Sequence, residues 1–312
     1  MFHHFHNGRH PTVQGSIAAE EFEEILWFIG VDRILHPITW LAKHEANSLE
    51  ARDLCLTLDD SLLCQIDVAL PVLERLGLKA FWFVYSSVFE GQLAKFEIYR
   101  AFRTRCFRAV DEFYERFFQA VLNSPFAPRV HEVLAESVIA ARQSMFPFYS
   151  IDDIRFRLIR DIALATPEYE GVMDALMQEA GVDPSPLADG LWMSDAHLSY
   201  LSERGHVVGL HSYSHPMTLA TLPRDAQREE YERNLSHLSR VCGRAPVVMA
   251  HPADSYNDDT VDILRTLGVR CGFRSTMSDA TRTNGRARWF EVPRRDHATI
   301  ARMLRERRSL ER

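Results

Sequence analysis

An apolar, strand-like stretch over residues 54–58 ends abruptly in two carboxylates, Asp59 and Asp60. Far along the chain, a second apolar stretch over residues 207–210 leads directly into His211 and, four positions later, His215. One carboxylate and two neutral imidazoles can hold a divalent ion while leaving coordination positions open, which is typical of a catalytic site. The fold must therefore bring the ends of two distant strands together.

Strand-like and helical patterns alternate outside the middle of the chain. The predicted strands cover residues 54–58, 80–85, 207–210, 246–250, 271–273 and 289–292, and the helical patterns between them include residues 65–76, 224–241 and 260–267. This alternation predicts a parallel β/α architecture. Asp59, Asp60, His211 and His251 each follow the carboxyl end of a predicted strand, where β/α barrels build their sites.

Residues 92–190 do not follow this alternation. Apolar residues recur there at steps of three and four over residues 95–122, and further helical patterns cover residues 129–142, 151–164 and 168–180. We therefore predict an all-helical insertion (92–190) that divides a barrel into residues 1–91 and 191–312. Its aromatic stripe favours packing against the barrel or against a partner in a homo-oligomer, with a lid over the substrate as the alternative.

Composition excludes several classes of protein. The net charge of −7 gives no reason to expect a nucleic-acid partner. The first residues are rich in histidine and contain no apolar core of a signal peptide, so we expect no membrane span and a cytoplasmic protein. The five cysteines form no C-x-x-C pair, which favours reduced thiols.

The two motifs resemble those of a known family. Residues 57–60 (TLDD) are similar to the T-F-D-D motif of the NodB-homology polysaccharide deacetylases, carbohydrate esterase family four, and residues 211–215 (HSYSH) are similar to their H-S/T-x-x-H motif. Residues 15–22 and 252–257 extend the resemblance. It implies an α/β fold of the distorted (β/α) barrel type and one divalent metal ion, expected to be zinc. Asp60, His211 and His215 would be the metal ligands and Asp59 the general base.

Other parts depart from the family pattern. Its third motif places an aromatic residue and a glycine after the proline, whereas Ala253 and Asp254 follow Pro252 here, so the groove wall is altered. We assign substrate contacts to four residues. These are His4, Pro252, Tyr256 and Arg294. Arg294 or Arg295 is also a candidate to orient Asp59 through a charge-assisted pair.

The histidine that protonates the leaving amine in the family lies in an L-x-H motif, which this chain lacks in clear form. His297, after the last predicted strand, is the nearest candidate, and His251 is the second. A surface histidine with no catalytic role remains the alternative at each position.

These features predict a metal-dependent hydrolase that removes an N-acyl group, expected to be acetyl, from a small carbohydrate. A nucleotide- or lipid-linked intermediate of surface polysaccharide synthesis, such as that of lipopolysaccharide, would suit a cytoplasmic enzyme. Two alternatives stay open: hydrolysis of a non-sugar amide or formyl group, and an inactive carbohydrate-binding protein that retains the ion.

Overall fold

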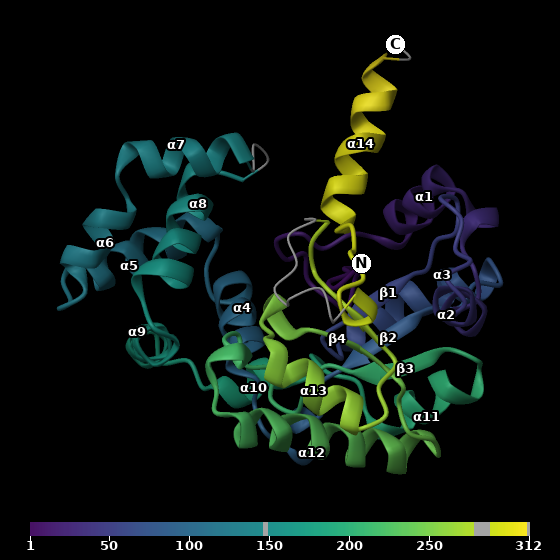
Figure 1. Cartoon of the computed structure of the whole chain (residues 1–312). Coiled ribbons are helices and arrows are strands. Elements are labelled where there is room, and N and C mark those ends of the chain that lie inside the picture. Colours follow the sequence, from purple (N-terminus) through teal and green to yellow (C-terminus); the bar gives the residue numbers. More distant parts are fainter. Residues whose placement is uncertain (146–148, 278–287, 311–312) are drawn as a thin grey trace. The chain divides into compact units, whose positions relative to one another are not determined.

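The structure is a computed structural model that describes residues 1–145, 149–277 and 288–310 (Figure 1). Contacts divide the chain into two compact units. The first unit combines Met1–Ala94 with Gly190–Arg312, and the second unit is Lys95–Asp189.

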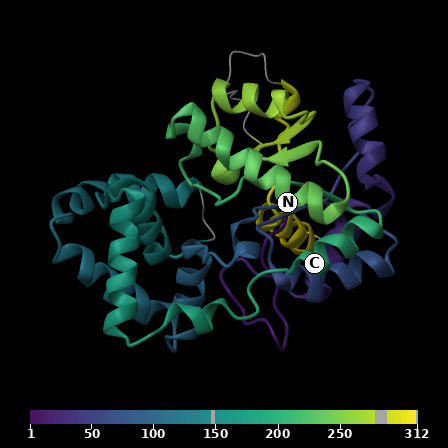
Figure 2. The ribbon, with the colours of Figure 1, turned by 90° about the horizontal axis from the view of Figure 1, so that it is seen from below.

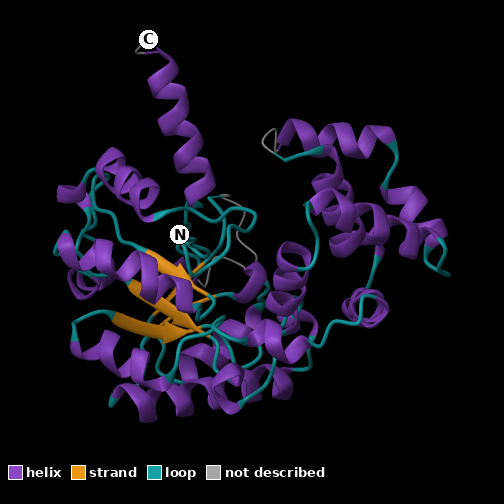
Figure 3. Cartoon of the chain, turned by 180° about the vertical axis from the view of Figure 1, so that it is seen from behind, coloured by secondary structure: helices purple, strands orange, loops and turns teal. Residues whose placement is uncertain are grey.

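The first unit is built on five parallel strands that curl into a half-barrel (Figure 3). The strands are β1 (Thr57–Asp59), β2 (Phe81–Val84), β3 (Val207–Leu210), β4 (Val248–Ala250) and β5 (Cys271–Phe273). Their order in the sheet follows their order in the sequence. Parallel neighbours need a crossover connection, usually a helix, so all five carboxyl ends lie at the same edge. The predicted fold class is confirmed.

Helices surround this sheet. In the first unit they are α1 (Ala19–Ile29), α2 (Pro37–Glu45), α3 (Leu70–Arg75), α11 (Asp195–Glu203), α12 (Arg224–Cys242), α13 (Asp258–Thr266) and α14 (His297–Leu310). The longest, α12, packs against β3, α11 and α13. It ends at Gly243, whose φ of 68° lies in the left-handed region that glycine adopts without strain.

Alternate side chains of the strands enter two hydrophobic clusters, as the period of two requires. Trp82 and Val84 pack in the larger cluster, while Phe81 and Phe83 pack with Phe273 in the smaller one. Because the strands are buried on both faces, they form near-continuous apolar runs rather than an apolar–polar alternation. This double burial fixes where each strand ends.

The amino terminus adds a short parallel stretch beside β1. The Phe2 amide donates to the Thr57 carbonyl at 2.9 Å, and the Asp59 amide donates to the Phe2 carbonyl at 3.1 Å. Phe2 is buried in the core. The residue after Phe2, His3, is therefore carried to the same edge of the sheet as Asp59.

The second unit is helical throughout its described part, and Figure 2 shows its helices in blue to teal. They are α4 (Lys95–Arg105), α5 (Val110–Leu122), α6 (Ala127–Val133), α7 (Glu136–Met145), α8 (Ile151–Leu158), α9 (Thr166–Glu179) and α10 (Pro184–Ala188). Buried aromatic residues, among them Phe113, Phe117 and Phe156, fill its interior. The helical pattern predicted over residues 95–122 forms two helices, because α4 ends at Arg105 and α5 begins at Val110.

Two predicted strands differ from the observed ones. The first is shorter, because Leu54 pairs with Ile34 in an isolated bridge and β1 begins only at Thr57. Asp59 is consequently the last residue of the strand itself. The predicted strand over residues 289–292 is wrong, because Arg288–Phe290 forms a 3₁₀ turn and only Val292 pairs with β5, at Phe273.

Candidate metal centre

Asp60, His211 and His215 converge at the carboxyl edge of the sheet. Oδ1 of Asp60 lies 3.3 Å from Nε2 of His211 and 3.5 Å from Nε2 of His215. One ligand atom from each residue lies within 4.8 Å of the other two. This spacing fits a single divalent ion bound by one carboxylate oxygen and two imidazole nitrogens.

The ligands sit on backbone of unusual conformation. Asp60 has a φ of 80°, and Ser212 and His215 have φ values of 63° and 57°. Positive φ is uncommon for residues other than glycine, and it persists only where the surroundings impose it. Ser212 contributes locally, because its Oγ accepts a hydrogen bond from the His215 amide at 3.0 Å. Such strain is a frequent feature of binding and catalytic sites.

Hydrogen bonding prepares the buried His211 ring for a metal. Its Nδ1 lies 2.8 Å from the Ala250 carbonyl, which can only accept, so Nδ1 carries a proton and Nε2, which faces Asp60, is the ring atom that can bind a metal. Metal-bound histidines are commonly oriented in this way. Burial opposes ionisation of Asp60, but the hydrogen bond from His211 and the charges of nearby histidines hold its pKa well below its usual value. The donor set therefore fits a divalent cation.

Asp59 is a second, almost fully buried carboxylate beside the ligands. Its two oxygens accept one hydrogen bond each from the Arg294 guanidinium, both at 2.7 Å. Burial opposes its ionisation, but Arg294 and then His211 and His3 outweigh this and lower the pKa of Asp59. Arg294 is held in turn by the Arg274 carbonyl at 2.6 Å. The orienting pair expected from Arg294 or Arg295 is made by Arg294.

His3 is a site residue that the sequence analysis missed. Its Nε2 lies 3.8 Å from Oδ2 of Asp59 and 4.0 Å from Oδ2 of Asp60, and its side chain is 27% exposed. His4, from the same histidine-rich segment, is the residue for which the sequence predicts a substrate contact. The signal that distinguishes them is the register of Phe2 opposite Leu58, which places His3 in line with Asp59. No residue spacing within the segment reveals that register.

His297 and His251 occupy other surroundings. His297 is the first residue of α14 rather than a strand end; its Nε2 contacts the Gly15 carbonyl at 2.8 Å and its ring stacks on Phe2. Nε2 of His251 contacts the Phe290 carbonyl at 2.8 Å, and its ring stacks on Tyr256. Each imidazole is engaged by a carbonyl and an aromatic ring, whereas His3 lies beside both carboxylates.

The turn over residues 252–257 is closely packed. Pro252 and Tyr256 are buried, and the Tyr256 hydroxyl donates to Oε1 of Glu291 at 2.9 Å. Ala253 and Asp254 both adopt positive φ, and Asp254 accepts a hydrogen bond from the Ser275 amide at 2.9 Å. These contacts explain the shape of the turn, and the substrate contacts assigned to Pro252 and Tyr256 stay predictions.

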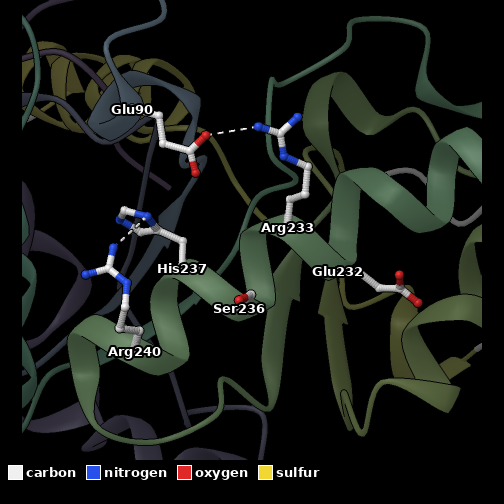
Figure 4. A pocket seen from close by; sticks show the side chains of 6 residues that line it. All are labelled: Glu90, Glu232, Arg233, Ser236, His237 and Arg240. Atoms are coloured by element: carbon white, nitrogen blue, oxygen red, sulfur yellow. Dashed lines mark hydrogen bonds and ion pairs between the residues drawn. The ribbon is translucent and has the colours of Figure 1, made fainter.

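A separate pocket lies along α12 (Figure 4). It is lined by Glu90, Glu232, Arg233, Ser236, His237 and Arg240. Arg233 pairs with Glu90 at 2.9 Å, and its Cζ lies 3.5 Å from the ring centroid of Tyr213, a residue of the loop between the candidate ligands His211 and His215. The lining contains none of the residues Asp60, His211 and His215, so this pocket is separate from the candidate metal centre.

Comparison with known proteins gives a family match over part of the chain. Residues 188–272, which include His211 and His215, match the family model described as polysaccharide deacetylase. No curated protein matches the chain. The resemblance to the polysaccharide deacetylase family is confirmed by this match and by the fold.

Solved structures share the fold at low sequence identity. IcaB from Ammonifex degensii has a TM-score of 0.54 at 15% identity, over 97% of this chain and 92% of its own. The Streptococcus pyogenes deacetylase PplD, in complex with acetate, has a TM-score of 0.54 at 14% identity, over 94% and 88%. A de-N-acetylase from Aggregatibacter actinomycetemcomitans has a TM-score of 0.52 at 11% identity, over 96% and 97%. None of the described helices has the length and apolar character to cross a bilayer.

Proposed function

We propose that this protein is a metal-dependent hydrolase that removes an N-acetyl group from a sugar. One observation carries the proposal: a buried carboxylate, Asp59, is fixed by Arg294 directly beside the cluster of Asp60, His211 and His215. A metal-holding role alone would not require a second carboxylate held in this way. The names of the similar structures, one a deacetylase and one a de-N-acetylase, support the same reaction.

Each residue has a definite task. Asp60, His211 and His215 would hold a divalent ion, expected to be zinc, which would supply polarisation of the acyl carbonyl and a lowered pKa for water. Asp59 takes one proton from the attacking water, whose oxygen forms the new bond to the acyl carbon. The bidentate bond from Arg294 orients Asp59 and keeps it ionised.

The departing amine needs a proton when its bond to the acyl carbon breaks, and we assign its delivery to His3. The side chain is partly exposed and its Nε2 lies close to both carboxylates, so the imidazole can face the leaving nitrogen. His297 and His251, the donors expected from the sequence, are engaged elsewhere.

We further propose a small substrate, such as a nucleotide- or lipid-linked amino sugar used to build a surface polysaccharide such as lipopolysaccharide, and a cytoplasmic location. The support is the altered turn after Pro252, where Ala253 and Asp254 replace the aromatic residue and glycine of the family pattern. Assembly of several copies stays a prediction that the aromatic stripe does not support, because Phe113, Tyr114 and Phe117 are buried within the second unit itself.

The test is acetate release by zinc-loaded protein from three N-acetylglucosamine substrates: the nucleotide-linked sugar, the lipid-linked sugar and a soluble oligomer. We expect turnover of a linked monosaccharide to exceed that of the oligomer, to stop on chelation and to return with zinc. Faster turnover of the oligomer would overturn the proposed substrate size. Binding of all three without hydrolysis would favour the inactive carbohydrate-binding protein, and release from a non-sugar amide alone would favour an amidohydrolase.

A further inference from the structure

The loop that carries the two histidine ligands is held by residues outside the metal motifs. It runs from His211 to His215 and contains two residues of positive φ, Ser212 and His215. Because left-handed backbone is disfavoured for both residue types, the loop needs external contacts to keep this shape. The distance between the two imidazoles depends on that shape.

Glu230 of α12 supplies three such contacts. Its Oε2 accepts hydrogen bonds from the amides of Tyr213 at 3.0 Å and Ser214 at 2.8 Å. Its Oε1 accepts a third from the Ser214 hydroxyl at 2.6 Å. Hydrogen bonds to a charged acceptor are roughly twice as strong as neutral ones, so one side chain fixes the middle of the loop.

Asn234 fixes the start of the loop. Its Oδ1 accepts a hydrogen bond from the His211 amide at 3.0 Å, and its Nδ2 donates to the Val84 carbonyl at 3.0 Å. The side chain is fully buried. It therefore links the carboxyl ends of β2 and β3, where His211 begins the loop.

Glu230 and Asn234 lie four positions apart and share one face of α12. Arg233, which lies between them in sequence, packs over the Tyr213 ring. Glu90, which precedes the second unit, accepts a hydrogen bond from the Tyr213 hydroxyl at 2.7 Å. The backbone of Tyr213 is thus held by Glu230 and its ring by Arg233 and Glu90. All these contacts fall on the segment between the two ligands.

We infer that Glu230 is a positioning residue for the metal: it sets the spacing of the His211 and His215 imidazoles through the loop backbone, with Asn234 anchoring the first ligand. This inference rests on the proposed metal centre. Partners that orient ligands in this way typically contribute about 10- to 100-fold to metal affinity. Glu230 itself touches neither ligand side chain in any contact described above, so its influence must pass through the backbone.

The test titrates metal-free protein with Co²⁺, whose visible absorption reports coordination geometry as well as binding. We expect Glu230→Ala to weaken Co²⁺ binding by about 10- to 100-fold and to change the absorption bands. Glu230→Gln should restore most of both, because its carbonyl oxygen can replace Oε2 and its amide can donate to the Ser214 hydroxyl. Glu232→Ala, which removes an exposed carboxylate from the same helix, is the matched control.

Affinity and bands like those of the wild type in Glu230→Ala would overturn the inference, as would an equal loss in Glu232→Ala. If Glu230→Ala does not fold, Ser214→Ala tests the inference instead. This substitution removes only the hydrogen bond from the exposed Ser214 hydroxyl to Glu230. About a threefold loss of affinity is expected there, and an unchanged titration would contradict the inference. A wild type that binds no Co²⁺ would instead refute the proposed metal centre.

Discussion

Both compact units bury charged side chains, but they arrange them differently. In the first unit, Asp59, Arg294 and His211 come from different segments and meet at the carboxyl edge of the sheet, beside the ligand cluster. In the second unit, Arg103 lies over the rings of Phe113 and Phe156 within a helical core. Burial lowers the pKa of Arg103 to about 10.

The difference shows that a buried charge alone does not mark a functional site. A perturbed pKa occurs in structural ion-pair networks as well as in active sites. In the second unit the buried Asp153 accepts hydrogen bonds from Tyr114 and Arg157, both at 3.2 Å, and Arg103 lies over aromatic rings. In the first unit the carboxylates and imidazoles converge on one point, which is what catalysis requires.

The largest expected effect comes from removing a ligand at that point. His211→Ala should abolish stoichiometric zinc binding and acetate release together, because two ligands do not replace three in a tetrahedral site. Elemental analysis and the acetate assay on the same preparation measure both. A normal metal content in this variant would show that His211 is not a metal ligand.

The next effect distinguishes two histidines of the first unit. His3→Ala should lower kcat by about 10²- to 10⁴-fold with little change in KM, because proton donation acts mainly in the transition state. His297→Ala should retain most of its turnover while losing thermal stability, since its ring packs on Phe2. A large loss of kcat in His297→Ala with little loss in His3→Ala would instead make His297 the proton donor.

A substitution in the second unit tests whether its buried charge has only a structural role. Arg103→Met keeps a long side chain against the two rings but removes the charge. We expect its free energy of unfolding to change by less than about 2 kcal/mol, because apolar replacement of buried ions is often close to neutral. Zinc affinity and kcat should not change. A tenfold fall in either would mean that the charges of the second unit act on the metal centre.

The smallest effect is a pH dependence from a buried histidine of purely structural role. Nδ1 of His206 accepts hydrogen bonds from the Ala80 amide at 3.2 Å and the Trp82 indole at 3.0 Å. Burial, followed by the charges of Lys79 and His36, lowers its pKa to about 3. The folded chain therefore resists protonation there, whereas the unfolded chain takes up a proton near its usual pKa of about 6.5.

The contribution of neutral His206 to the free energy of unfolding is fully present above pH 6.5. It is lost as the pH falls from 6.5 toward 3, by about 1.4 kcal/mol per pH unit. His206→Asn retains an acceptor near the position of Nδ1 but does not titrate. Between pH 7.5 and 5.5 the variant should lose about 1.4 kcal/mol less of its unfolding free energy than the wild type. Equal losses in urea titrations would contradict the assignment.

Much of the fold could be predicted because its signals are local. Apolar runs that end in Asp59 and His211 predicted the strands and the shared edge, and periodic aromatic residues predicted helices in the middle of the chain. The Asp60, His211 and His215 cluster followed from two motifs. Strand 289–292 could not be predicted correctly, because its apolar residues pack as a 3₁₀ turn, a tertiary effect.

The missed part of the site depends on pairing between distant segments. His3 reaches the carboxylates because Phe2 pairs with β1, and the structure decides that Arg294 rather than Arg295 reaches Asp59. Neither the register nor the direction of these side chains is encoded in nearby residues. The position of His3 was not predicted for this reason, whereas the roles expected for His4 and His297 stay predictions.

The most direct measurement is the rate of acetate release per bound zinc ion in wild type and Asp59→Asn. The substituted amide would keep the size of the side chain but cannot accept the proton of water, while Asp60, His211 and His215 remain intact. We expect one zinc ion per chain in both proteins and a rate about 10²- to 10⁴-fold lower in the variant. Full metal content with an undiminished rate would contradict the role of Asp59, and loss of the metal would make Asp59 a ligand.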